Sequence, residues 1–345
     1  MAPPDVVVII VGFRNAADIV GCLRALSLAR SGPRFDVFVA ENGAPDGFDA
    51  LVDTLTGPDS PCTLLQHERN FIRPLRIVEK KIFTLSRAAS GDDALVHVAR
   101  MPENLGYAGG INAWLRALLD RPGWHAAWIL NPDTEPSPTA LFELADYAEK
   151  HNKGMVASRI ISTTMPHDAH LCGLRWRKLS SRTVSVDHPA VAIFFGAPRG
   201  MEALMDAPDG TSIYVTRSLI ERIGLMDERY FLYYEDLEWG FRAKALGELG
   251  YAHRSYVPHK GGTTIGSSSR RATRSRLAVY MEFRNRILFV RNRYPTWLLW
   301  TFLLQLAHIG TYLLAGSLRN MVAASRGLLA GLRGESGEPV NFLRA

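Results

Sequence analysis

Apolar residues near the start of the chain change from a continuous run to a helical repeat. Residues 6–11 are an uninterrupted and largely β-branched run, which is typical of a strand covered on both faces. Ile19, Leu23 and Leu26 then follow at helical spacing. A buried strand followed by an amphipathic helix predicts the opening of an α/β fold.

The same alternation returns twice, with each predicted strand ending in polar turn residues. Residues 35–40 lead into the turn-rich segment 41–47, and residues 126–130 end at Asn131-Pro132-Asp133. The pattern predicts a mostly parallel sheet flanked by helices. Ligands of such sheets bind beyond the carboxyl ends of the strands, so we expect these polar loops to share one site.

A basic segment, residues 66–98, is too long to be a simple strand connection and is predicted to be an insertion. Two interpretations stay open for it: a solvated helical excursion, or a docking surface for an acceptor or a membrane. No internal repeat is found.

The last third of the chain reads as helical. Residues 235–246 predict a helix that Gly247 ends. The composition changes after Gly262, where serines and arginines predict a mobile loop. We therefore expect an α/β domain over residues 1–262, followed over residues 263–345 by a mobile basic loop and C-terminal helices.

Residues 297–318 are largely apolar and approach the ~20 residues that span a bilayer. Gln305 and His308 interrupt the run, so a membrane span is not the first choice. Arginines at 319, 326 and 333 follow it. An interfacial helix on an anionic leaflet, a buried core helix and a homodimer helix are the interpretations left open.

Composition limits the functional classes. The 345 residues are 47% hydrophobic, which suffices for a substantial core, and a net charge of +6 indicates an anionic partner. No recognition-helix, zinc or RNP-type signature accompanies the charge, so nucleic-acid binding is not expected. Cys22, Cys62 and Cys172 are too dispersed for a disulfide framework, and the N-terminus lacks a basic signal-peptide flank, so a cytoplasmic location is expected.

Residues 103–112 place Gly106, Gly109 and Gly110 at the start of a predicted helix. Glycines there let backbone N–H groups approach a phosphate, and the alternative is a tight loop before an ordinary helix. The segment does not match the P-loop pattern.

Two groups of side chains are candidates for chemistry. Asp133 follows a hydrophobic strand and suits a hard cation, and His259 lies beside a flexible glycine pair and can complete a Mn²⁺ site. Glu235, Asp236 and Glu238 crowd one helical turn, which raises carboxyl pKa values and favours a general base. The alternatives are a structural histidine and a solvated acidic helix start.

Taken in order, these segments resemble the family 2 glycosyltransferases, and in particular their rhamnosyltransferase-like branch. The resemblance runs from about residue 6 to residue 295. The segments that carry it are Phe13-Arg14-Asn15, Glu41-Asn42-Gly43, Asn104-Leu105-Gly106-Tyr107-Ala108-Gly109-Gly110-Ile111-Asn112, Leu130-Asn131-Pro132-Asp133, Asp227-Glu228-Arg229-Tyr230-Phe231, Tyr234-Glu235-Asp236, His259 with Gly262, and Arg284-Asn285.

The resemblance implies a GT-A fold and a role for each matching position. Asp133 and His259 would hold a divalent cation, Mg²⁺ or Mn²⁺, and Asp236, paired with Glu235, would be the base that takes the acceptor proton. Glu41 would lie near the nucleotide base, and Arg284 would face the diphosphate. The implied donor-binding positions are Phe13, Asn15, Glu41, Asn104, Gly106, Gly109, Gly110, Asn112, Asn131 and Arg284. The sequence departs from the family where an acidic pair is reduced to Asn131 and Asp133, which weakens the expected metal affinity.

The implied activity is inverting transfer of a sugar, with rhamnose favoured, from a nucleotide diphosphate donor such as dTDP-rhamnose, a UDP-sugar or a GDP-sugar. The acceptor would be a hydroxyl of a glycan or lipid-linked glycan in bacterial surface polysaccharide synthesis. The enzyme would act in the cytoplasm or peripherally at the inner face of the membrane. The alternative is a catalytically silent scaffold or glycan-binding protein with the same fold. A nucleotidyltransferase is disfavoured, because Gly12-Phe13-Arg14 is a poor substitute for its Gly-rich basic loop.

Overall fold

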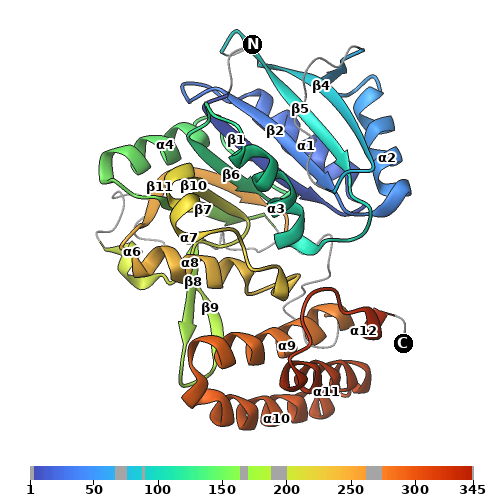
Figure 1. Ribbon diagram of the computed structural model, residues 1–345, viewed down its shortest axis with the longest axis vertical. Helices are drawn as coiled ribbons and strands as arrows, with labels where there is room; N and C mark the ends of the chain where they lie inside the picture. The colour runs from blue at the N-terminus through green and yellow to red at the C-terminus, as the bar shows by residue number, and fades with distance from the viewer. Residues whose placement is uncertain are drawn as a thin grey trace.

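The computed structural model describes residues 4–66, 76–87, 90–163, 170–187, 200–261 and 274–343. These residues form an eleven-stranded sheet with helices on both faces, and the C-terminal helices make a separate layer (Figure 1). The strands are β1 (Val6–Gly12), β2 (Phe35–Glu41), β3 (Cys62–Leu64), β4 (Glu79–Arg87), β5 (Asp92–Arg100), β6 (Ala126–Leu130), β7 (Met155–Ser162), β8 (His170–Arg177), β9 (Arg182–Asp187), β10 (Ser212–Thr216) and β11 (Leu249–His259). The helices are α1 (Ala16–Ser27), α2 (Ala44–Thr56), α3 (Gly106–Leu119), α4 (Ala140–His151), α6 (Met201–Leu204), α7 (Arg217–Ile223), α8 (Glu235–Ala245), α9 (Arg276–Arg293), α10 (Leu298–Leu314), α11 (Leu318–Arg333) and α12 (Val340–Leu343), with the short 3₁₀ turns η1 (Glu228–Tyr230) and η3 (Pro295–Trp297).

The centre of the sheet is parallel and confirms the predicted strands. β1 pairs in parallel with β2 and β6, and β2 pairs in parallel with β5. Gly12 lies opposite Glu41 in the register, and Leu130 lies opposite Ile10. The carboxyl ends of these strands therefore meet at one edge, as the positions of the polar loops predicted.

The second half of the sheet is mixed. β10 runs antiparallel to β6 and β7, and β11 runs parallel to β7. Because β10 is reversed, its first residue, Ser212, lies opposite Leu130 at the end of β6. β11 ends at His259 on the same edge, where an isolated bridge joins His259 to Thr134. The fold class is α/β as expected, with antiparallel pairs added to the parallel centre.

The described part of the basic segment 66–98 contains no helix. Its described part forms the antiparallel pair β4 and β5, and β5 joins the sheet beside β2 with Val98 opposite Val39. Its alternating apolar residues, Ile82, Phe83, Leu85, Val96 and Val98, are buried. The helical interpretation was wrong because the lysines and arginines hid a strand alternation. Residues 67–75 of this segment lie outside the described residues.

Two hydrophobic cores lie on the two faces of the sheet. Along β1, Val6, Val8 and Ile10 belong to the core that contains α1, α2 and α4, while Val7 and Ile9 belong to the core that contains α3. This alternation follows from the two-residue repeat of a strand. The turn-rich segment 41–47 is only partly a turn, since α2 already begins at Ala44.

The C-terminal helices pack through small residues. An added Cβ at Gly327 of α11 would lie 2.3 Å from the carbonyl oxygen of Tyr280 in α9, and one at Gly331 would lie 2.7 Å from that of Arg284. Such distances are shorter than carbon–oxygen contact allows, so these glycines set the closeness of α9 and α11. The helical region predicted after residue 262 is confirmed, and the predicted mobile loop falls in residues 262–273, outside the described ones.

We expect Gly327→Ala to lower the free energy of unfolding by about 1–3 kcal/mol, because the added methyl group meets backbone that cannot yield easily. Gly310→Ala in α10 is the matched control, since its Cβ would meet no atom within 4 Å. This control should stabilise the protein by up to about 1 kcal/mol through helix propensity. Urea unfolding measures both. Equal effects of the two substitutions would contradict the close packing of α9 and α11.

Candidate active site

Glu41 is a buried carboxylate at the end of β2, on the edge where the loops meet. Its Oε1 accepts hydrogen bonds from the backbone N–H groups of Arg14, at 3.0 Å, and Gly43, at 2.7 Å. Its Oε2 is buried with no hydrogen-bond partner among the described residues. Burial raises the pKa of Glu41, although the two N–H groups lower it. Oε2 lies against Gly12, where an added Cβ would be only 2.4 Å from it.

Two predicted donor-binding residues lie in the loop beside Glu41. Phe13 is 41% exposed, and the Arg14 guanidinium lies 6.0 Å from its ring centroid. Asn15 accepts a hydrogen bond from the Phe13 backbone N–H through Oδ1, which fixes the turn between β1 and α1. Phe13 therefore offers an exposed ring beside the unpartnered oxygen of Glu41.

Asp133 and His259, predicted from separate parts of the chain, are brought together. Asp133 follows β6 and His259 ends β11, and Asp133 Oδ1 lies 3.1 Å from His259 Nε2. Burial lowers the pKa of His259, but the hydrogen bond and charge of Asp133, with the charge of Asp209, outweigh it and raise that pKa overall. The pair lies at the same sheet edge as Glu41.

The pair fits the requirements of a small divalent cation. Two adjacent ligands at about 2.1 Å in octahedral geometry are about 3 Å apart, close to the observed separation of Asp133 and His259. Within the described part of the chain, no group of three His, Cys, Asp or Glu side chains could hold a metal. A cation here would therefore take most of its ligands from water or from diphosphate oxygens.

Glu235 and Asp236 begin α8, where Glu235 is buried and Asp236 is half-buried. Burial and then the charge of Asp236 raise the pKa of Glu235 to about 8, and burial and then the charge of Asp209 raise the pKa of Asp236 to about 7. Asp236 Oδ2 accepts from the Gly210 N–H at 3.0 Å, and Oδ1 accepts from the Leu237 N–H at 2.7 Å. Glu235 therefore does not fit the alternative of a solvated acidic helix start, and Asp236 is only partly exposed.

The segment Asp209-Gly210-Thr211, which the sequence analysis did not identify, connects the two groups. Gly210 donates to Asp236, and the Thr211 carbonyl oxygen accepts from the Asn131 N–H at 3.0 Å. Tyr107 Oη donates to the Gly210 carbonyl oxygen at 2.5 Å. The Asp209 charge acts on both Asp236 and His259. An Asp-Gly turn directly before the apolar run 213–215 was the only available signal.

A strained loop presents the carboxylates. Phe231, Tyr233 and Tyr234 have φ values of 63°, 67° and 78°, which side chains other than glycine rarely adopt. Asn285 of α9 holds this loop, because its Nδ2 donates to the carbonyl oxygens of Tyr230, Leu232 and Tyr233 at 2.8–2.9 Å. The C-terminal helices therefore fix the start of α8.

The role predicted for Arg284 is wrong. Its side chain is 1% exposed, and its guanidinium donates to Asn285 Oδ1 and to backbone carbonyl oxygens of Tyr230 and Gly337. These bonds consume the donors that a diphosphate would need. Arg284 instead fastens the loop to α9 beside Asn285.

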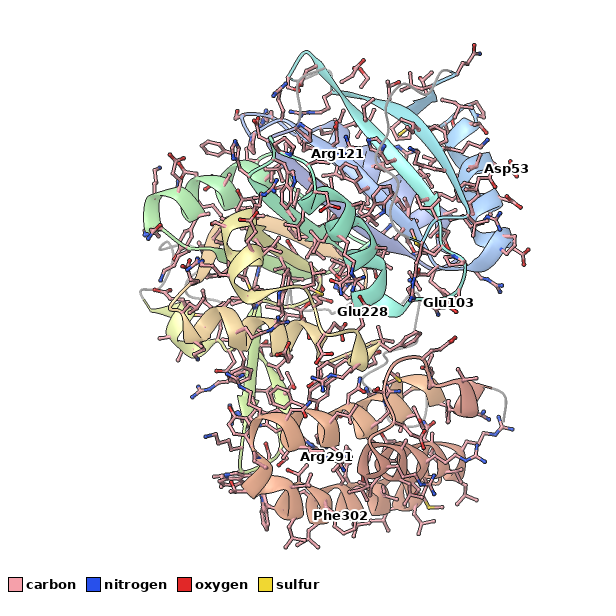
Figure 2. The ribbon with its side chains drawn as sticks, in the orientation of Figure 1. Asp53, Glu103, Arg121, Glu228, Arg291 and Phe302 are labelled. Carbon is pink, nitrogen blue, oxygen red and sulfur yellow. The ribbon has the colours of Figure 1, made fainter. Side chains whose placement is uncertain are left out.

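Asn112 and the glycines of its segment also differ from their predicted roles. Asn112 is fully buried and exchanges hydrogen bonds with the Met226 backbone while donating to Glu228. The Gly106 N–H donates to Asn104 Oδ1, and the Tyr107 N–H donates to the Phe231 carbonyl oxygen, so these two groups are not available to a phosphate. The segment supports the loop before α8. Figure 2 shows Glu103 and Glu228 on the side of the sheet that faces the C-terminal helices.

The three glycines serve close packing. An added Cβ at Gly106, whose φ is 71°, would lie 2.3 Å from the Phe231 carbonyl oxygen, and one at Gly110 would lie 2.9 Å from Val11. At Gly109 the Cβ would lie 2.8 Å from Leu105. By contrast, the predicted Asn104 and Asn131 are only half-buried and lie at the sheet edge, where they stay donor-site candidates.

The chain is similar to known glycosyltransferases. The family model described as glycosyl transferase family 2 matches residues 84–202, which include Asn131 and Asp133. The low-salt glycan biosynthesis hexosyltransferase Agl10 of Haloferax volcanii is 26% identical over 211 residues, which are 59% of this chain and 62% of that protein. The chain thus spans less than two thirds of the length of this relative.

Two solved structures share the fold over nearly the whole chain. A mannosyltransferase from Pyrobaculum calidifontis, in complex with GDP-Man and Mn²⁺, has a TM-score of 0.50 at 15% identity, covering 100% of this chain and 79% of that one. S. aureus TarS 1-349, in complex with UDP-GlcNAc, has a TM-score of 0.52 at 13% identity, covering 96% and 81%. The fold is of the GT-A type. With the family match and the Agl10 similarity, these findings support a family 2 glycosyltransferase.

Stability should depend on pH through Glu235. Between its ordinary pKa of 4.5 and its raised value of about 8, the folded state holds a proton that the unfolded state releases, so stability falls as pH rises through this window. Glu235→Gln should make this fall smaller and leave the part that the raised pKa of Asp236 contributes. Relative to wild type, its free energy of unfolding should gain up to about 1.4 kcal/mol per pH unit there.

Urea unfolding at several pH values measures this dependence. Glu103→Gln, which replaces an exposed glutamate labelled in Figure 2, is the control and should follow the wild-type profile. Parallel pH profiles for wild type and Glu235→Gln would show that burial does not hold a proton on this carboxyl.

Proposed function

We propose that the protein is an inverting glycosyltransferase that moves a sugar from a nucleotide diphosphate to a hydroxyl group. The observation that carries the proposal is the placement of Asp236, a half-buried carboxylate that two backbone N–H groups hold in place and whose pKa is raised by burial and by the charge of Asp209. The segment 209–211 links it to the sheet edge where Asp133 and His259 meet. A base and a cation site are thus arranged around one edge.

Asp236 would accept the proton of the acceptor hydroxyl. The freed oxygen attacks the anomeric carbon as the bond to the diphosphate oxygen breaks, and the nucleoside diphosphate leaves with the electron pair. A single displacement of this kind inverts the anomeric configuration. A base with a pKa near the working pH combines a large ionised fraction with useful basicity. Burial and the charge of Asp236 raise the pKa of Glu235, which favours its protonated form.

Asp133 and His259 would hold the divalent cation, Mg²⁺ or Mn²⁺. When bound, such an ion stabilises the negative charge on a leaving diphosphate. Glu41 Oε2 would accept a hydrogen bond from an N–H of the nucleotide base, and Phe13 would contact the base or ribose with its exposed ring. Both roles fit the unpartnered oxygen of Glu41 and the exposure of Phe13.

Rhamnose carried by dTDP is the donor we favour, and this rests on the order of motifs shared with the rhamnosyltransferase-like branch. UDP-sugars and GDP-sugars are the alternatives, because the solved structures with this fold hold UDP-GlcNAc and GDP-Man. A glycan or lipid-linked glycan of a surface polysaccharide is the proposed acceptor. The proposed location is the cytoplasm or the inner face of the cytoplasmic membrane.

Asp236→Asn should lower the turnover number by about 10²–10⁴-fold, because it removes the base and leaves the shape of the site. Donor affinity should stay within about twofold, since Asp236 acts on the acceptor. The wild-type rate should fall below about pH 7 as Asp236 is protonated, and the residual rate of the variant should lack this dependence.

Release of nucleoside diphosphate and calorimetric donor binding measure the two effects. Asp53→Asn, on the outer side of α2 in Figure 2, is the control and should behave as wild type. Near-wild-type turnover by Asp236→Asn would remove Asp236 from the role of base.

Thermal unfolding should report the donor and the metal together. We expect one of dTDP-rhamnose, UDP-glucose, UDP-galactose or GDP-mannose to raise the midpoint in the presence of Mn²⁺ or Mg²⁺, because a ligand of the folded state stabilises it. EDTA or Asp133→Asn should remove most of this rise. A rise that survives both would exclude the Asp133–His259 pair as the cation site. No response and no turnover with any donor would favour the silent scaffold.

A further inference from the structure

Helix α10 has the reverse of the usual polarity. Its buried residues, Thr301, Gln305, His308 and Tyr312, form a polar stripe at spacings of four, three and four. The opposite face is apolar and exposed, and its residues are Leu299, Trp300, Leu303, Leu306, Leu313 and Leu314, with Leu314 at 89% exposure. A surface helix of a soluble domain normally turns its apolar face inward. The outward face of α10 therefore requires an apolar environment.

Contacts from both faces of α10 hold this helix against the rest of the protein. Thr301 Oγ1 lies 2.7 Å from Ser181 Oγ in the β8–β9 turn, and the Trp300 indole N–H donates to the Leu179 carbonyl oxygen at 2.9 Å. His308 stacks on Phe283 of α9 with ring centroids 5.1 Å apart. The polar side of α10 therefore packs against the β8–β9 turn and α9, and its apolar face points outward. α10 lies at the bottom of the view in Figure 1.

A basic cavity adjoins this apolar face. It measures about 310 Å³ and is lined by Arg276, Arg319 and Arg326 together with Leu318, Val322 and Phe342. No described carboxylate lies within ion-pair distance of these three arginines. Leu318, which is 59% exposed, lies just past the turn that follows Leu314 and joins the cavity to the apolar face. Residues 274–343 carry nine arginines against three glutamates.

We propose that α10 and the cavity of α11 form a docking surface for an anionic lipid bilayer. The leucines of α10 enter the interface between headgroups and acyl chains, and Arg276, Arg319 and Arg326 bind lipid phosphates. Apolar burial combined with basic residues is what holds an in-plane helix on an anionic leaflet. The phosphates and acyl chains of one bilayer match the arginines and the adjoining leucines together.

The helix lies in the membrane plane and does not cross it. Pro295–Leu314 is the one segment, in the part of the chain that the structure describes, long and apolar enough to span, with a mean hydropathy of 1.3. A spanning helix would have to leave its contacts with Ser181 and Phe283 and expose Gln305 to lipid. Burying only the apolar face keeps all of these contacts.

Vesicle co-sedimentation of the full chain tests the surface. We expect binding to vesicles of equal parts phosphatidylcholine and phosphatidylglycerol, and much weaker binding to phosphatidylcholine alone. Arg319→Gln with Arg326→Gln should weaken binding to the anionic vesicles by about 10–30-fold, since each basic residue near the surface contributes about fivefold. Leu303→Gln with Leu306→Gln should weaken binding to both compositions by about tenfold or more.

Controls keep the outcome interpretable. Arg30→Gln with Arg121→Gln removes two exposed arginines elsewhere on the molecule, Arg121 lying at the far end from α10 in Figure 2, and should leave anionic binding within about twofold. The replaced side chains are exposed, so thermal unfolding without lipid should not change. Absence of vesicle binding, or binding that neither double variant weakens, overturns the proposal.

Two other results would assign the face to a different role. A wild-type dimer in sedimentation velocity that Leu303→Gln with Leu306→Gln converts to monomer, without vesicle binding, would make the face a contact between copies of this chain. Retention in vesicles after alkaline carbonate extraction would show a spanning helix. None of these readouts needs a sugar donor, so the membrane surface can fail while the proposed transfer activity holds.

Discussion

The geometry of Glu235 and Asp236 depends on the hydrogen bonds that α9 makes to the loop before α8. Three non-glycine residues of this loop have positive φ, and each such conformation typically costs about 1–3 kcal/mol. Such a loop persists only where its surroundings hold it. Asn285 supplies three hydrogen bonds, Arg284 adds bonds to the preceding backbone, and Tyr107 donates to the Phe231 carbonyl oxygen from the other side. The start of α8, and hence Asp236, is fixed by contacts that lie outside the sheet.

This constraint gives a common explanation for several sequence features. Gly106 has no side chain because the Phe231 carbonyl oxygen occupies the space where a Cβ would be, and Asn112 is buried because it holds Met226 and Glu228. Segments that resemble a phosphate loop and a diphosphate-binding arginine instead surround and support one strained turn. Residues that match a family motif can therefore have a structural role and not a ligand-binding one.

The sequence predicted the strands and the loops at their ends well, because buried parallel strands are continuous apolar runs that end abruptly. It also named Asp133 and His259 as partners in one cation site, from their ligand chemistry and the family resemblance, and the two side chains do lie 3.1 Å apart. Asp209 escaped notice because it precedes a strand, and only the antiparallel direction of β10 places the start of that strand beside the end of β6. The donor role of Arg284 was wrong because charge does not reveal whether a guanidinium faces a ligand or backbone carbonyl oxygens. The direction of a strand and the burial of a side chain depend on contacts between segments far apart in the sequence. A local sequence pattern does not contain this information.

The C-terminal helices both support the loop before α8 and carry the proposed membrane surface. α9 presents Asn285 and Arg284 to the loop before α8, and it packs against α10 through Phe283 and against α11 through the glycine contacts. The proposed membrane surface is therefore built on the same helices that hold the proposed catalytic base. An enzyme that uses an acceptor anchored in lipid needs its base at a fixed height above the bilayer. A single helical layer that contacts the lipid on one side and fixes the catalytic loop on the other meets this requirement without a flexible linker.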